Sequence, residues 1–230
     1  MEQAQVPGDI RDIAARQVER LAETVAGLTD ADLVAPTRCS GWLVAHLLAH
    51  MRLGLAEHAT SFAEPAKPGE HADRDYVSYW RDFPPAAEPP GYGGVRFHWA
   101  NASAYTTADG MRGHFADTAR AAAGLTRRAP EGSYRIQGHV MDAADILAMW
   151  TVEWVIHQLD LTAHLPGGRP APSADAVALT ARTLDGLLGR VPRPGWDDVT
   201  YILKGTGRVP IDEADREHLG DQAAAYPALG

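Results

Sequence analysis

The sequence predicts an all-α protein, mainly a four-helix bundle with a long connection between its second and third helices and a short helical C-terminal extension. Long segments in which apolar residues recur every three or four positions are separated by Pro and Gly breaks. There is no run of strand-like segments and no internal repeat. Hydrophobic residues make up 45% of the 230 residues, which is enough for a packed core. We expect residues 1–165 to form the bundle and residues 166–230 to pack on it, within a single structural domain.

The first two long helices follow from their capping residues and breaks. Asp9 is placed to cap a first amphipathic helix that ends near Gly27. After a turn and Pro36, Ser40 is the predicted N-cap of a second helix, which ends near Phe62.

The second helix carries histidines on its apolar side. His46 and His50 are four residues apart and therefore face the same way. The apolar residues Leu43 and Leu47 place His50 at the buried seam. His50 is therefore the inward candidate of the pair, whereas His58 near the helix end is interpreted as a solvated histidine.

Residues 64–101 lose the helical period, because prolines and the GYGG sequence at Gly91–Gly94 interrupt them repeatedly. We predict a short helix near Tyr76–Phe83 within this connection. Aromatic residues are concentrated here, which is typical of a lid over a pocket or of a flap that covers exposed core. They are Tyr76, Tyr79, Trp80, Phe83, Tyr92, Phe97 and Trp99.

The second half of the chain continues the helical pattern. A third helix is expected at about 102–128, and an alternating segment at 134–140 is predicted to be a hairpin arm or an extended lead. Asp142 can cap the fourth helix, which runs without Pro or Gly to Leu165. A fifth helix at 173–188 and two short helices around a GTGR turn complete the chain. That turn lacks the spacing of a P-loop.

The fourth helix places polar groups where apolar ones belong. Glu153 and His157 share a face with Ile146, Trp150 and Leu161, because these residues step by three or four. Burial without partners would cost about 2 to 7 kcal/mol per polar group. A divalent metal bound by both residues would satisfy them, and a core hydrogen-bond pair or a solvent-facing Glu153 is the alternative.

The bundle topology adds a third candidate ligand. With the long connection between the second and third helices, the second and fourth helices can pack together in an antiparallel bundle. His50 would then lie opposite Glu153 and His157, which forms a His-Glu-His site.

Composition argues against several classes of protein. The net charge of −9 and the absence of a Lys/Arg-rich run argue against nucleic-acid binding. The single cysteine, Cys39, excludes an internal disulfide. No apolar run approaches the roughly 18 residues that span a bilayer, and the first ten residues do not have the order of a signal peptide. We expect a cytoplasmic protein without a membrane segment, and the arginine and alanine bias is typical of a GC-rich bacterial genome.

Two motifs carry a resemblance to a known family. PTRCSGWLVAHLLAHM at Pro36–Met51 and VEWVIHQLDL at Val152–Leu161 resemble the two motifs of the DinB-like bundles related to mycothiol-dependent maleylpyruvate isomerase. The similarity spans most of residues 9–165. It implies the same bundle fold and, in an actinobacterial setting, a mycothiol-dependent enzyme.

The resemblance also implies a zinc ion, or another divalent metal, held by His50, Glu153 and His157. His46 would be a neighbour of this metal. Cys39 and Trp42 belong to the first motif, where they are interpreted as anchors of a buried turn. Asp160, just after His157, would orient that ligand or make a salt bridge.

Such a metal centre would ionise a bound thiol and hold it beside a small electrophile, so that S-transfer, conjugation or isomerisation could follow. In the aromatic connection, Arg81, Arg96 and His98 are candidate catalytic groups for an anionic substrate or a developing enolate. Trp80 and Trp99 are assigned to cofactor binding. The isomerase has a separate C-terminal domain, and its catalytic arginine has no clear counterpart here, so we favour a mycothiol S-transferase.

Two other classes stay open. A metal-dependent hydrolase, or an Fe(II) enzyme, could use the same three ligands, although no HExxH motif supplies a base. A non-catalytic helical binding module would keep the three residues as a buried polar network. The expected partners are a low-molecular-weight thiol and a small electrophile, with the chain acting as a monomer or homodimer.

Overall fold

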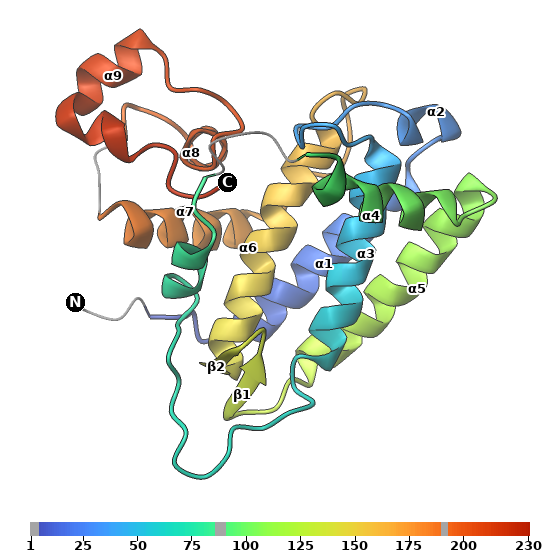
Figure 1. Ribbon diagram of the computed structural model, residues 1–230, viewed down its shortest axis with the longest axis horizontal. Coiled ribbons are helices and arrows are strands. Elements are labelled where there is room, and N and C mark those ends of the chain that lie inside the picture. Colours follow the sequence, from blue (N-terminus) through green and yellow to red (C-terminus); the bar gives the residue numbers. More distant parts are fainter. Residues whose placement is uncertain (1–4, 86–90, 190–192) are drawn as a thin grey trace.

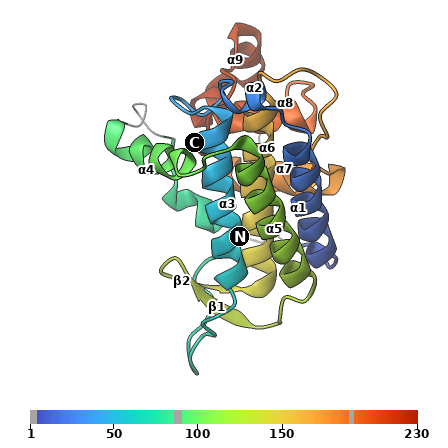
Figure 2. The same ribbon diagram turned by 90° about the vertical axis from the view of Figure 1, so that its right-hand side faces the viewer.

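The computed structural model describes residues 5–85, 91–189 and 193–230, and its core is a four-helix bundle (Figure 1). The bundle consists of α1 (Ile10–Ala26), α3 (Val44–Thr60), α5 (Ala108–Arg127) and α6 (Ala143–Thr162). Helix α1 packs against α5 and α6, and α3 packs against the same two helices (Figure 2). The predicted all-α fold is confirmed, including the contact between α3 and α6 on which the proposed site depends.

The first helix forms because its apolar residues fall on one side. Val18 and Leu21 are fully buried, and the helix ends at Gly27 as predicted. Asp9 is at the N-cap position, but its side chain makes no capping hydrogen bond. The short α2 (Asp30–Leu33) follows, capped by a reciprocal pair between Thr29 and Asp32.

The second long helix begins at Val44, so the prediction of Ser40 as its N-cap is wrong. Residues 36–43 instead form a loop closed by an antiparallel bridge between Pro36 and Leu43. Gly41 takes a φ of +77° in this loop, a conformation that favours glycine. His46 Nδ1 accepts a hydrogen bond from the Leu43 N–H at 3.1 Å and thereby satisfies a free donor at the helix start.

The long connection contains more helix than predicted. A 3-10 helix, η1 (Ser78–Asp82), lies where a short helix was expected. The helix α4 (Tyr92–Ser103) was not expected, because two glycines lie in its first turn and prolines precede it in the sequence. Its packing against α3, with Val95 buried, outweighs the low helix propensity. Consequently α5 begins at Ala108 instead of near 102.

The alternating segment at 134–140 is not a single hairpin arm, because it spans most of one strand, the turn and the start of the second strand. Strands β1 (Ser133–Ile136) and β2 (His139–Asp142) pair antiparallel, with Ile136 opposite His139. The two-residue turn between them has φ of +49° at Gln137 and +86° at Gly138. Positive φ at both positions is the pattern of a type I′ turn, which suits the twist of a hairpin.

The remaining elements pack beside α6. Helix α7 (Ala174–Leu188) contacts α6, and α8 (Asp198–Gly205) contacts α7. The chain continues through α9 (Glu213–Leu219) and η2 (Gly220–Ala225), which Figure 1 shows beyond α8. Among the described residues, no helix combines the length and apolar character required to cross a bilayer.

Candidate metal centre

The three predicted ligands meet between α3 and α6. His50 Nε2 lies 3.2 Å from His157 Nε2 and 3.2 Å from Glu153 Oε1. His157 Nε2 lies 3.1 Å from the same Glu153 oxygen. Their side chains are partly exposed, at 28%, 25% and 12% for His50, Glu153 and His157, so a ligand can approach them.

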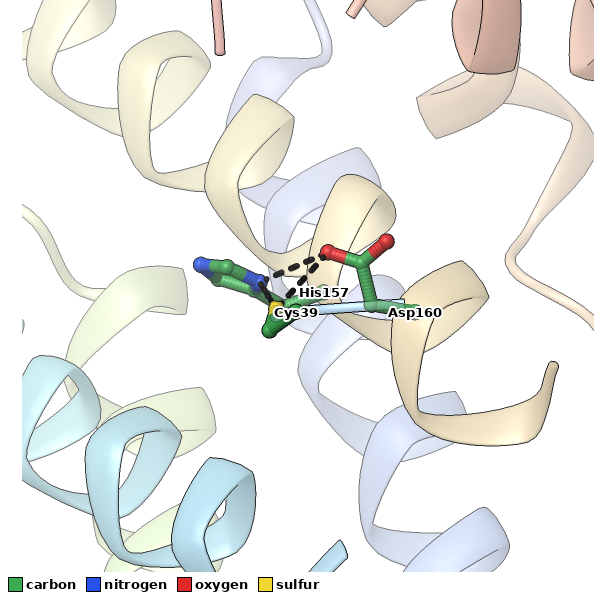
Figure 3. A group of neighbouring side chains, drawn as sticks. All are labelled: Cys39, His157 and Asp160. Carbon is green, nitrogen blue, oxygen red and sulfur yellow. Dashed lines mark hydrogen bonds and ion pairs between the residues drawn. The ribbon is translucent and has the colours of Figure 1, made fainter. Parts of the chain in front are cut away.

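The opposite edge of His157 is held by a buried carboxylate. Asp160 is fully buried and accepts a hydrogen bond from His157 Nδ1 at 3.1 Å (Figure 3). The proton on Nδ1 leaves the Nε2 lone pair directed toward Glu153 and His50. The sequence-based interpretation of Asp160 as an orienting residue therefore has a geometric basis.

Cys39 lies on the same side of the ring as Asp160. Its sulfur is 3.4 Å from Asp160 Oδ2 and 3.9 Å from His157 Nδ1 (Figure 3). These three residues are themselves close enough to share an ion. We interpret them as a support for the ligand His157, because the guanidinium of Arg208 already provides the positive charge beside Asp160.

Arg208 was missed by the sequence reasoning, which treated GTGR only as a turn. Its Nη2 is 3.3 Å from Asp160 Oδ2, and its Nη1 donates to the carbonyl of Thr206. Gly207, with φ of +70°, makes the bend that directs the chain back toward α6. An arginine after a glycine turn was the only local signal, and nothing in the sequence indicated its partner.

The charges of the site depend on one another. Burial alone would raise the pKa of Glu153, but His157 and His50 hold it well below its usual value. Burial alone would lower the pKa of His157, but Glu153, Asp160 and Cys39 raise it well above its usual value. Asp160 is likewise buried, yet His157 and Arg208 lower its pKa. The site is thus built to hold a positive charge between His157 and its acidic neighbours.

The donor set fits a divalent metal. Tetrahedral bonds of about 2.0 to 2.2 Å place neighbouring ligand atoms about 3.3 to 3.6 Å apart, close to the separations of the three atoms here. Two imidazoles and one carboxylate are a zinc-ligand set that leaves a coordination position open. Without a metal, a proton on one of the ring nitrogens can hold these three atoms together by hydrogen bonding. His50, Glu153 and His157 are therefore the residues that would hold the metal.

The site opens into a cavity of about 1010 Å³. Its walls come from α3, α6, η1, α4, the loop before α3, the hairpin turn, the Arg208 turn and residues 227–230. Trp42 packs edge-on against His50, with ring centroids 5.2 Å apart. The aromatic rings lining the cavity are those of Trp42, Tyr79, Trp80, Phe83, Phe97 and Trp150. The connection from residue 64 to 101 therefore combines both predicted roles, since it covers core and walls a pocket.

His98 is the predicted catalytic residue that the fold places at the site. Its ring centroid is 4.9 Å from that of His50 and 4.5 Å from that of Trp42. Burial, reinforced by the nearby histidines, lowers the pKa of His98 to about 4. Its buried Nδ1 makes no hydrogen bond within the described part of the chain. Neutral His98 can therefore offer a ring nitrogen to a ligand.

The other predicted site residues are placed differently. Trp80 lines the cavity, whereas Arg81 and Arg96 are exposed and are not among the described residues that line it. Trp99 donates its indole N–H to the carbonyl of Gly41 at 3.2 Å and supports the loop before α3. His46 packs against Trp99 in a tilted arrangement, with ring centroids 5.9 Å apart, and caps α3 outside the ligand group.

Two histidines and a glutamate on facing helices of a bundle are an arrangement that could hold a metal ion. The family model described as "Mycothiol maleylpyruvate isomerase N-terminal domain" matches residues 14–162. The chain therefore belongs to this family, which confirms the predicted DinB-like fold. A solved structure, described as the crystal structure of the mycothiol-dependent maleylpyruvate isomerase, aligns with a TM-score of 0.51 and 16% identity, over 78% of this chain and 68% of that one. No curated protein sequence matches the chain significantly.

Proposed function

We propose that this protein is a metal-dependent cytoplasmic enzyme in which a low-molecular-weight thiol, mycothiol, attacks a small electrophile bound in the cavity. The convergence of His50, Glu153 and His157 on the cavity wall is the observation that carries the proposal. Membership of the family supports the choice of thiol, since both the family and the solved structure are named for mycothiol.

Zinc is the metal we propose, because two imidazoles and a carboxylate suit it. When bound, the metal would lower the pKa of a coordinating thiol and so favour the nucleophilic thiolate at neutral pH. Asp160 fixes the tautomer of His157 and Arg208 neutralises Asp160, so both act on the ligand without touching the substrate.

The cavity residues would position the electrophile. The aromatic walls of the cavity would exclude water from the reacting atoms, and this strengthens electrostatic interactions there. Arg38 lines the same cavity and can attract an anionic group. His98 stays neutral at pH 7 and can exchange a hydrogen bond with the substrate.

S-transfer and isomerisation begin with the same bond, from the thiol sulfur to a carbon of the electrophile. In S-transfer that bond stays in the product and a leaving group or an added proton completes the reaction. In isomerisation the bond breaks again after rotation, and the thiol is released. We favour S-transfer, and mass analysis of the product distinguishes the two.

The test is turnover of a set of electrophiles by zinc-loaded protein with mycothiol, with a simpler thiol and without thiol. We expect turnover only when a thiol is present, and loss of turnover in His50→Ala. Zinc-loaded protein that turns over no electrophile with either thiol would contradict the proposal. Turnover that is independent of thiol would favour the metal-dependent hydrolase instead.

A further inference from the structure

A chain of polar side chains crosses the cavity wall away from the metal ligands. Glu57 on α3, Tyr79 on η1 and Gln137 at the hairpin turn all line the cavity. The Tyr79 hydroxyl donates to Gln137 Oε1, and Gln137 Nε2 donates to Glu57 Oε1 at 2.7 Å. Three segments far apart in sequence thus place one hydrogen-bonded array in the pocket.

Gln137 is held in an unfavourable backbone conformation to make these contacts. Its φ of +49° is in the left-handed region. Gln137 is the one non-glycine residue with a positive φ among the residues that the structure describes. A side chain in this region costs about 1 kcal/mol relative to glycine, and type I′ turns usually use Asn or Gly. Glycine would form the turn more readily, so the amide of Gln137 is the feature that needs an explanation.

The array offers acceptors to the cavity. The single hydroxyl proton of Tyr79 is used toward Gln137, and the Gln137 amide directs its N–H toward Glu57. The positions that remain are the other oxygen lone pairs of Glu57, Tyr79 and Gln137 and the second amide N–H of Gln137, and the full charge among these three side chains is that of the Glu57 carboxylate. Burial raises the pKa of Tyr79, and the carboxylates of Glu153, Glu57 and Asp82 raise it further. This wall is accordingly negative, and it favours a ligand group that is both a donor and a cation.

The array is also at a defined distance from the metal ligands. Glu57 follows His50 by seven residues on one helix, which is a rise of about 10 Å. The rings of Trp80, Phe83 and Trp150 line the same cavity, and aromatic faces attract cations. An elongated ligand can therefore contact both ends of the pocket.

We infer that Glu57, Tyr79 and Gln137 bind a protonated amine of the substrate, about 10 Å from the atom that reacts at the metal ligands. This inference rests on the proposed function, because it places the reacting end of the ligand beside His50, Glu153 and His157. It narrows the electrophile to compounds with an amine at the end remote from the reacting carbon.

Two probe thiols test the inference by binding, without turnover. Calorimetry with the zinc-loaded full chain compares ω-aminooctanethiol with ω-hydroxyoctanethiol, which differ only in the remote group. We expect the amine to bind about tenfold more tightly, the effect of one charge-assisted hydrogen bond. Glu57→Gln keeps the size of the side chain and should reduce the preference to within about twofold. Glu217→Gln, at an exposed carboxylate on α9, is the control and should leave the preference unchanged.

Gln137→Gly separates a role in binding from a role in folding. Because glycine adopts a φ of +49° without strain, we expect no fall in the melting temperature but the same loss of preference as in Glu57→Gln. Equal binding of the two thiols to the wild-type chain, or a preference that persists in Glu57→Gln, would overturn the inference. Binding of neither thiol would instead overturn the proposed function, together with the inference that rests on it.

Discussion

The Nε2 atoms of His50 and His157 lie 3.2 Å apart, although 107 residues separate them in the chain. With the Nδ1 proton of His157 directed to Asp160, the two facing nitrogens and the Glu153 oxygen are held together either by a proton on a ring nitrogen or by a metal ion. Metal binding and its loss in variants therefore decide between a metalloenzyme and a helical binding module.

Asp160→Asn tests the support behind His157. The substitution removes the negative charge that holds the Nδ1 proton of His157 and should lower metal affinity about 10 to 100-fold. Competition with a chelator of known affinity measures the change. Asp117→Asn, at an exposed carboxylate paired with Arg120, is the matched control. Unchanged affinity in Asp160→Asn would show that Asp160 only stabilises the fold.

Helical periodicity decides which side chains share a face, and for this reason the three candidate ligands could be placed together from the sequence. Glu153 and His157 are one turn apart on α6, and their mutual contact follows from local geometry. The position of His50 opposite them required only the bundle topology.

The parts that sequence reasoning missed depend on contacts between distant segments. Arg208 reaches Asp160 across 48 residues, and Gln137 reaches Glu57 across 80. Neither contact produces a periodic pattern in the amino-acid sequence. Similarly, α4 forms despite its glycines because it packs against α3, which local propensity cannot reveal.

His58 predicts a pH dependence of stability. It was expected to be solvated, but it is fully buried, with Nε2 donating to Thr126 Oγ1 at 2.8 Å and Nδ1 buried without a partner among the described residues. Burial lowers its pKa from 6.5 to about 4, so the folded state resists protonation. As the pH falls from 6.5 to 4, the unfolded chain gains a proton that the folded chain does not, and up to about 3 kcal/mol of stability is lost.

Urea unfolding of the wild type and of His58→Gln between pH 4 and 7 measures this effect. The difference between the two free energies of unfolding should change with pH in the window set by His58. The comparison with His58→Gln is needed because Asp145 also titrates in this range. Burial raises the pKa of Asp145 to about 6, so its protonation stabilises the folded state as the pH falls, opposite to the effect of His58. A difference that is constant with pH would show that His58 is not a neutral buried residue.

Gly186 on α7 packs closely against Val77, which precedes η1. We therefore expect substitutions at these two positions to have coupled effects on stability. A Cβ at Gly186 would lie 2.7 Å from Val77 Cγ1, and Val77 is buried. We expect Gly186→Ala to destabilise the protein by about 1 kcal/mol, since the overpacking outweighs the gain in helix propensity. In a Val77→Ala background the same substitution should be neutral or stabilising. Additive effects in the double variant would contradict the contact.

The most direct test is the zinc content of the purified protein, measured by elemental analysis in the wild type, His50→Ala and His157→Ala. His46→Ala is the matched control, because His46 is one turn from His50 on the same helix and lies outside the ligand group. We predict about one zinc ion per chain in the wild type and in His46→Ala, and loss of most of the metal in the other two variants. Stoichiometric zinc in both His50→Ala and His157→Ala would contradict the ligand set and the thiol chemistry that depends on it.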